Sequence, residues 1–223
     1  MPQLMPRTWL LPGQGMSSDE FLERWERMPE LKRAELLEGI VYMASPVRIE
    51  HGSADGLVSR WLGRYADATP GLRLLPATTC VFGERNVPQP DQSLIVRPEY
   101  GGQTKIVDGY LTGAPELAVE VSYSSADYDQ TIKKSIYAAA GVVEYVVFDL
   151  LAQKVTWWRL VDNGYRKILR GPDGVRRSHV FPGLWLDERA FWSEDNERMM
   201  KVAAQGLASP EHADFRKKLT KRR

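Results

Sequence analysis

The chain has 223 residues, 43% of them hydrophobic and 26% charged, which is the size and composition of a soluble globular protein with one medium-sized domain. Its formal net charge of +1 argues against a wide basic face that binds nucleic acids regardless of sequence, so phosphate contacts must come from local clusters of charge. The single cysteine, Cys80, excludes an intrachain disulfide and a cysteine-rich zinc site, and no apolar run reaches the roughly 18 residues of a membrane-spanning helix.

The N-terminal third predicts a loose arm followed by a helix, two short strands and a second helix. Residues 1–16 are rich in proline, glycine and methionine and are expected to form the arm. Ser17 and Glu20 have the spacing of a capping box at the start of a helix that Pro29 ends. Within residues 34–44 we expect two short strands around Glu38-Gly39, or one strand with a bend there, and after them a helix over residues 49–67.

The middle of the chain predicts the strands of a sheet, expected over residues 72–75, 78–82, 92–96, 116–121 and 142–149. The fourth of these is apolar apart from two glutamates, as in a strand buried within a sheet. Residues 98–113 are mostly glycine, proline and polar residues, which favours an excursion or a flexible loop. A helix ending at Gly141 joins the last two strands, and such a unit implies a right-handed crossover that gathers polar residues into one cleft.

The C-terminal part changes to an antiparallel pattern. Residues 154–160 and 165–169 predict a hairpin around Asp162-Asn163-Gly164. Two further short runs, 176–180 and 184–186, are candidates to extend this sheet, and residues 187–205 predict a helix. The elements together predict an α/β protein, an α+β mixed sheet flanked by helices, as one domain over residues 17–205. A basic tail is expected over residues 206–223.

Four side chains on separate predicted elements suit metal-assisted hydrolysis of a phosphodiester. Asp91 lies at a strand start and Glu120 at a strand end, where burying an unpaired carboxylate costs several kcal/mol and calls for a cation. Their oxygens are ligands that Mg²⁺ accepts, with coordination positions left for water and phosphate. Lys133 would place positive charge on the developing charge of the transition state, and Glu35 would complete or orient the site.

The sequence resembles the PD-(D/E)xK nuclease superfamily and, within it, the Uma-type family of restriction endonucleases. The residues that carry the resemblance span about 34 to 160 and are Ala34-Glu35-Leu36-Leu37-Glu38-Gly39, Ser45-Pro46 followed by His51, Pro90-Asp91, Pro115-Glu116-Leu117-Ala118-Val119-Glu120-Val121-Ser122, Asp129, Lys133, Tyr137, Gly141-Val142, Glu144-Tyr145 and Asp149. Each motif alone is weak, and the ordered set is fairly specific.

The resemblance implies a restriction-endonuclease-like fold with a Mg²⁺ site at Asp91 and Glu120. One departure from the superfamily's short motif is Ser122, which stands two residues after Glu120 where the motif has lysine. In the Uma-type pattern the lysine lies on the following helix and matches Lys133. The adjacent Lys134 is the alternative.

Several of these residues also have purely structural interpretations. Glu120 could form a salt bridge with Lys133 without a metal, and Glu35 is equally suited to pair with a nearby Arg or Lys. Asp129 is interpreted mainly as a helix or loop stabiliser. The residues with a possible place in the cleft are His51, Ser122 and Asp129.

The function predicted from the sequence is a Mg²⁺-dependent (or Mn²⁺-dependent) endonuclease acting on DNA in the cytoplasm, with no membrane association. Because cutting both strands of a duplex favours two-fold symmetry, we expect a homodimer. The alternative is a catalytically silent nucleic-acid-binding or interaction module with the same fold. A glycosidase that uses a carboxylate pair is a weaker third idea, since it leaves Lys133 without a role.

Overall fold

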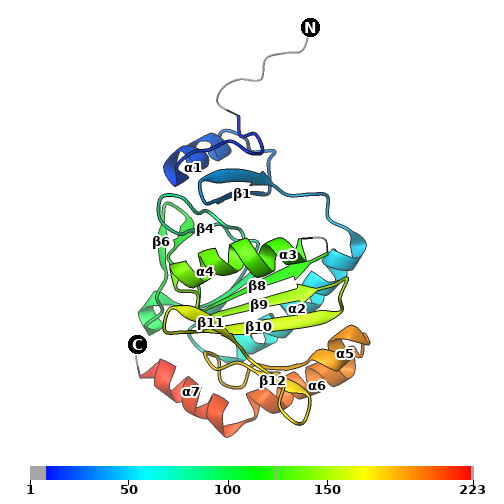
Figure 1. The fold of residues 1–223 in the computed structure, drawn as a ribbon. Coiled ribbons are helices and arrows are strands. Elements are labelled where there is room, and N and C mark those ends of the chain that lie inside the picture. The colour runs from blue at the N-terminus through cyan, green and yellow to red at the C-terminus, as the bar shows by residue number, and fades with distance from the viewer. Residues whose placement is uncertain (1–8, 124, 222–223) are drawn as a thin grey trace.

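The computed structural model describes residues 9–123 and 125–221 and centres on a six-stranded mixed sheet (Figure 1). The strand order is β11-β10-β9-β8-β5-β3, in which β8 and β9 are parallel and the other neighbours antiparallel. The strands are β3 (Leu72–Pro76), β5 (Gln92–Val96), β8 (Leu117–Ser122), β9 (Glu144–Asp149), β10 (Lys154–Val161) and β11 (Gly164–Lys167). The expected fold class, a mixed sheet flanked by helices, is therefore confirmed.

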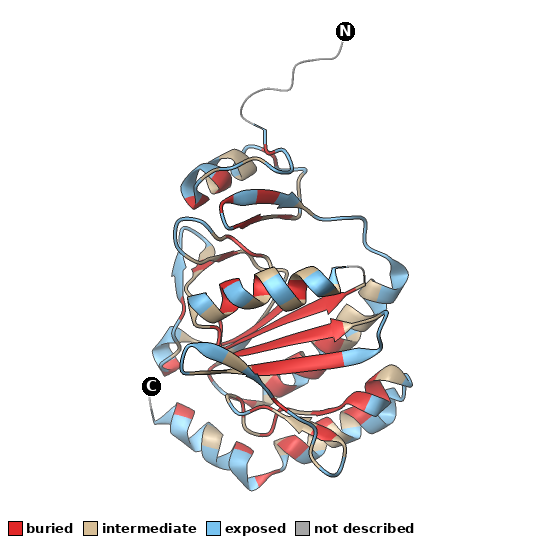
Figure 2. Cartoon of the chain, viewed as in Figure 1, coloured by how far each residue is buried: buried red, intermediate tan, exposed pale blue. Residues whose placement is uncertain are grey.

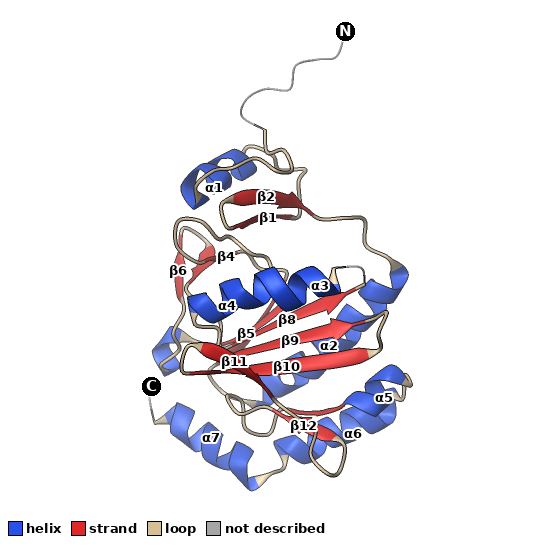
Figure 3. Ribbon diagram, in the orientation of Figure 1, coloured by secondary structure: helices blue, strands red, loops and turns tan. Residues whose placement is uncertain are grey.

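Helices cover both faces of this sheet, so its central strands are buried (Figures 2 and 3). Every residue of β5 and β8 is buried, including the polar Gln92 and Ser93 at the start of β5, and most residues of β8 are apolar, as is usual for a central strand. On one face lies α2 (Ile49–Ala68), whose buried Trp61 and Tyr65 recur one helical turn apart and pack into the largest core cluster. None of the helices in the described ranges is long and apolar enough to cross a membrane.

The other face is covered by the crossover between β8 and β9. It runs through α3 (Ala126–Tyr128), a π-helical turn η2 (Asp129–Lys133) and α4 (Lys134–Ala140). Gly141 ends α4 with a φ of 92°, a left-handed conformation that favours glycine. The predicted strand-helix-strand unit is thus present, and the π turn within it is a deviation that the sequence did not predict.

The N-terminal segment forms a small layer of its own beside the sheet. It contains α1 (Ser18–Glu26) and the hairpin of β1 (Ala34–Leu37) and β2 (Ile40–Met43), packed around Leu36 and Phe21. The Ser17 hydroxyl accepts a hydrogen bond from the amide of Glu20, as the capping box predicted. Residues 1–8 of the expected loose arm lie outside the described residues. The remainder is not loose, because residues 13–16 hydrogen-bond to the hairpin and Leu10 is buried.

Residues 98–113 form ordered structure rather than the flexible loop that their composition favoured. They contain a 3₁₀ turn η1 (Pro98–Tyr100) and two strands, β6 (Lys105–Val107) and β7 (Tyr110–Thr112), which join β4 (Cys80–Val81) in a three-stranded sheet. The buried Glu116 holds the segment, accepting hydrogen bonds from the amides of Val96 and Gln103. Val96 and Glu116 both lie outside residues 98–113, so the composition of that segment did not indicate this anchor.

The C-terminal part corrects two further expectations. The runs near residues 176 and 185 do not extend the main sheet but pair with each other, as β12 (Val175–Arg177) and β13 (Trp185–Asp187). The expected basic tail includes helix α7 (Pro210–Thr220), which packs through the buried His212 and Leu219 while its basic side chains face solvent. It follows two other helices, α5 (Glu188–Trp192) and α6 (Asn196–Leu207).

A buried carboxylate, Glu144, fixes the turn between β12 and β13 to the main sheet. Its Oε1 accepts hydrogen bonds from the amides of His179 (2.6 Å) and Val180 (2.9 Å). Its Oε2 accepts from the Ser178 hydroxyl (2.8 Å) and the Trp157 indole (2.9 Å). Burial raises the pKa of Glu144, although the four donors favour the charged form. A fully satisfied buried carboxylate of this kind specifies one position for the turn.

We predict that Glu144→Gln lowers the free energy of unfolding by about 3 kcal/mol. All four partners of Glu144 are hydrogen-bond donors, and the NH₂ group of glutamine is a donor as well. About two of the four hydrogen bonds would therefore be lost. Urea denaturation of the variant checks this, with Glu30→Gln, at an exposed position, as the matched control. A loss below about 1 kcal/mol would show that Glu144 does not anchor the turn.

Candidate active site

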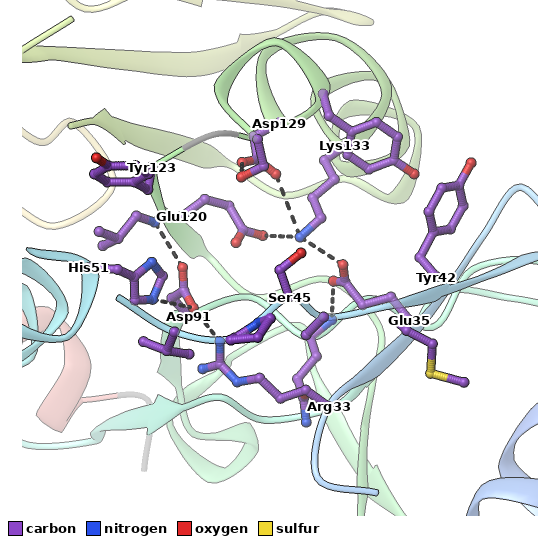
Figure 4. Close-up of a pocket in the computed structure, with 18 of the residues that line it drawn as sticks. Arg33, Glu35, Tyr42, Ser45, His51, Asp91, Glu120, Tyr123, Asp129 and Lys133 are labelled. Carbon is purple, nitrogen blue, oxygen red and sulfur yellow. Dashed lines mark hydrogen bonds and ion pairs between the residues drawn. The ribbon is translucent and has the colours of Figure 1, made fainter. Parts of the chain in front are cut away.

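A cavity of about 590 Å³ opens between the N-terminal hairpin and the main sheet (Figure 4). One wall consists of the hairpin and the segment that leads from it into α2. The opposite wall is formed by the residues after β8 and by the π turn η2. The floor contains the carboxylates of Glu35, Asp91, Glu120 and Asp129 together with the ammonium group of Lys133. The cavity therefore brings together all four residues predicted as catalytic.

Strand register brings Asp91 and Glu120 together. Gln92 of β5 pairs with Val119 of β8 in an antiparallel ladder, so one further step places Asp91 opposite Glu120. The amide of Val121 donates a hydrogen bond to Asp91 Oδ2 at 2.9 Å. The two residues are only 5% and 4% exposed, respectively. Directly opposite positions in a sheet place side chains about 5 Å apart at Cβ, close enough for two carboxylates to share one cation.

Asp91 is also paired with two basic groups at the mouth of the cavity. Arg33 Nη1 lies 3.0 Å from its Oδ1, and His51 Nε2 lies 3.6 Å from the same oxygen. Burial raises the pKa of Asp91, but His51, the Val121 amide and Arg33 outweigh it and hold this pKa below its ordinary value. The same contact raises the pKa of His51. Asp91 is therefore ionised at neutral pH.

Lys133 makes three ion pairs inside the cavity. Its Nζ lies 2.9 Å from Glu35 Oε2, 3.1 Å from Glu120 Oε1 and 3.7 Å from Asp129 Oδ1. Burial lowers the pKa of Lys133, but these carboxylates raise it well above its ordinary value, so the group is an ammonium. Burial and the neighbouring carboxylates also raise the pKa of Glu120, against the opposing effect of Lys133. The floor therefore carries more negative charge than Lys133 neutralises.

Asp129 and Glu35 each have a second anchor. Asp129 Oδ2 accepts hydrogen bonds from the hydroxyls of Ser122 (2.6 Å) and Ser125 (2.7 Å). Glu35 Oε1 accepts one from the amide of Gln89 at 2.7 Å. Each carboxylate thus contacts Lys133 with one oxygen and the protein framework with the other. The π turn brings Asp129 and Lys133 to the same side, and π turns of this kind are frequent at functional sites.

Two further residues belong to the site and were not predicted as members of it. Tyr137 donates a hydrogen bond to Glu120 Oε1 at 2.7 Å, and its position one turn after Lys133 on the same helix face was an available signal. Arg33 is 58 residues from Asp91 in the sequence and lies in no recognisable motif. Its contact depends on how the hairpin folds over the sheet, which the sequence pattern does not reveal.

The donor set fits a small divalent cation of the Mg²⁺ type. Among the described residues, both side-chain hydrogen bonds of Glu120 use Oε1, and none uses Oε2. No group of three or more His, Cys, Asp or Glu residues within the described ranges is arranged to hold a metal ion. Mg²⁺ is commonly bound by one or two carboxylates, with water and substrate phosphate completing the shell, so a pair such as Asp91 and Glu120 is compatible with this ion in the number of protein ligands.

Comparisons with known proteins agree with this fold. The sequence matches the Uma2 family, described as "Putative restriction endonuclease", over residues 18–189. The chain also superposes on a crystal structure described as a "putative nuclease belonging to DUF820" from Anabaena variabilis, with a TM-score of 0.62 and 16% sequence identity. That superposition covers 80% of this chain and 98% of the other, and at such low identity it shows the fold alone. No curated protein matches the sequence.

The structure places the predicted residues as follows. Glu35, His51, Asp91, Glu120, Asp129 and Lys133 all line the cavity, while Ser122 lies behind it and supports Asp129. Lys134, the alternative to Lys133, points elsewhere and lies 5.3 Å from the centre of the Trp158 ring. The roles of these residues in catalysis and metal binding stay predictions.

We predict that Lys133→Met costs about 3–5 kcal/mol of unfolding free energy at pH 8, because three carboxylates lose their shared cation. Burial raises the pKa of Glu120, and without the ammonium group that opposes this rise Glu120 ionises in the folded protein only at a higher pH than in the unfolded chain. The loss therefore grows as the pH rises from 5 to 8. Urea denaturation at both values measures it.

Lys134→Met is the matched control, since among the described residues the side chain of this neighbour contacts the Trp158 ring alone, a contact worth at most about 1 kcal/mol. Equal losses for the two variants, or a Lys133→Met loss that does not depend on pH, would contradict the assigned network.

Proposed function

Because the chain belongs to the Uma2 family, whose description is "Putative restriction endonuclease", we propose that its cleft hydrolyses phosphodiester bonds of DNA with the help of Mg²⁺ or Mn²⁺. The observation that carries this proposal is the juxtaposition of two carboxylates and an ammonium group in one recess. Asp91 and Glu120 adjoin on neighbouring strands, and Lys133 lies 3.1 Å from Glu120. This combination can bind a cation and still present positive charge to a phosphate.

Asp91 and Glu120 would hold the cation, and their neighbours would keep them in place. The cation, when bound, supplies polarisation of the phosphoryl oxygen and a lowered pKa for its water. The amide of Val121 and the side chain of His51 orient Asp91, while Tyr137 and Lys133 orient Glu120 through Oε1. Such supporting contacts commonly change metal affinity by a factor of about 10 to 100.

Lys133 would stabilise the charge that develops on the phosphoryl group, and Glu35 and Asp129 would position it. Glu35 contacts Lys133 and the Gln89 amide, which favours a role in holding the lysine over a role as a metal ligand. Asp129, anchored by two serine hydroxyls, restrains the same ammonium group from the opposite side. The lysine is therefore held by groups from three separate elements, as a preorganised cation requires.

A catalytically silent binding module remains the second candidate, and one observation favours it. The carboxylates of the cleft already have basic partners within the chain, since Lys133 pairs with Glu35, Glu120 and Asp129 while Arg33 pairs with Asp91. Internal ion pairs of this kind can serve structure alone. The expected homodimer belongs to this proposal too, and light scattering at high protein concentration tests it.

The two candidates differ in metal binding and turnover. We predict saturable binding of Mn²⁺ and Mg²⁺ by calorimetry, together with metal-dependent cleavage of DNA. Asp91→Ala removes a ligand charge and should abolish both, whereas Asp67→Ala, at an exposed position of α2, should change neither.

If the protein binds Mn²⁺ or Mg²⁺ but cleaves neither single-stranded nor double-stranded DNA, the metal site is supported and the proposed reaction is contradicted. No saturable binding by the unmodified protein would contradict the nuclease proposal and favour the silent module.

A further inference from the structure

The walls of the cleft carry aromatic rings on both sides of its floor. Tyr42, Tyr123 and Tyr128 line the cavity. Tyr42 pairs with Glu35 across the β1–β2 hairpin, and Tyr123 follows the end of β8, three residues after Glu120. The Tyr42 and Tyr123 rings accordingly flank the row of Glu35, Lys133 and Glu120 from opposite sides (Figure 4). A strand whose phosphate reaches the floor therefore meets an aromatic ring on each side of it.

Tyr42 is exposed and Tyr123 is half-buried, and each ring contacts another planar group. The guanidinium group of Arg48 lies 5.0 Å from the centre of the Tyr123 ring, and Arg48 itself is exposed. Tyr42 is 37% exposed, and its ring centre lies 5.2 Å from that of Tyr128. Aromatic faces and guanidinium planes are the groups on which unpaired bases stack, at about 1–3 kcal/mol per base. In a duplex the base faces are covered by their neighbours, so these rings have nothing to stack on.

The depth of the floor also favours a flexible strand. Asp91, Glu120 and Lys133 are at most 6% exposed, at the bottom of a recess of about 590 Å³. That volume lies in the range of pockets that enclose a small ligand. An unpaired strand can bend one phosphate into such a recess. A duplex bends little over a few base pairs, and each of its phosphates is backed by paired bases and the opposite strand.

We infer that the cleft takes an unpaired nucleic-acid strand, with one base stacked on the Arg48–Tyr123 pair and another on Tyr42 on the far side of the scissile phosphate. This inference rests on the proposed nuclease function and adds the state of its substrate. Stacking also accounts for binding by a chain of net charge +1, because it needs few phosphate contacts. The recognised chemistry is shared by single-stranded DNA, single-stranded RNA and locally melted duplex. A single copy of the chain suffices for such a strand.

Fluorescence anisotropy with labelled 12-nucleotide strands tests this, with Ca²⁺ in place of Mg²⁺ so that the strand is not consumed. We expect the protein to bind oligothymidylate, oligouridylate or both at least tenfold more tightly than a duplex of the same length. Preference between the two strands separates DNA from RNA. Tyr123→Ala and Arg48→Ala should each weaken binding to the preferred strand about tenfold, the effect of losing one stacked base.

Two control variants keep the test decisive. Tyr123→Phe keeps the ring and removes only the hydroxyl, so its affinity should stay within about twofold if the ring carries the contact and the fold is intact. Arg60→Ala, at an exposed position of α2, the helix that Arg48 precedes as its N-cap residue, should leave binding unchanged. Duplex binding as tight as single-strand binding, or an unchanged affinity in Tyr123→Ala, would overturn the inference.

Metal-dependent cleavage of duplex DNA that is unchanged in Tyr123→Ala would support the nuclease proposal and contradict the inference that the cleft binds an unpaired strand. Single-strand preference that depends on Tyr123, in a protein without any cleavage, would support the binding site and remove the catalysis.

Discussion

One buried ammonium group holds the cleft together. Lys133 joins Glu35 from the N-terminal hairpin, Glu120 from the central sheet and Asp129 from the crossover, so three parts of the chain meet at a single Nζ. Removing a partner from a buried ion-pair network leaves uncompensated charge, which typically costs about 3–5 kcal/mol. This network is one of the contacts that hold the hairpin over the sheet and so enclose the cavity. The hairpin is also held by the backbone pairing of Leu36 with Val87, in the segment between β4 and β5.

The same network leaves the floor short of positive charge. Four carboxylates line it, and burial together with mutual repulsion raises the pKa of Glu120 even beside Lys133. A divalent cation between Asp91 and Glu120 would remove that repulsion, which gives the proposed metal site an electrostatic reason as well as a geometric one. The basic groups Arg33, Arg48 and His51 line the mouth of the same cavity, so an incoming phosphate meets cations before it meets the floor. In this proposal the acidic residues bind the metal cation, and the basic residues attract the phosphate of the substrate.

The sequence predicted the central part of this arrangement because its signals are local. Asp91 and Glu120 mark strand ends, and Lys133 and Tyr137 follow Asp129 at helical spacing, while the antiparallel pairing of β5 with β8 brings Asp91 to Glu120. Arg33 was missed since only the fold of the hairpin brings it to Asp91. Ser125 was missed for a different reason, because its contact depends on the loop before α3. The sequence also did not predict that residues 98–113 and α7 are ordered. The contacts that hold them, Glu116 with Val96 and His212 with Thr69, join positions that are distant in the sequence.

The most direct test of the central claim is the position of a metal ion in the cleft. Crystals soaked in Mn²⁺ give an anomalous signal that locates the ion independently of turnover. The account predicts one site coordinated by carboxylate oxygens of both Asp91 and Glu120, with Lys133 still beside Glu120. An ion bound elsewhere, or no ordered ion in a cleft whose carboxylates keep only their internal partners, would contradict it and make the Lys133 network purely structural.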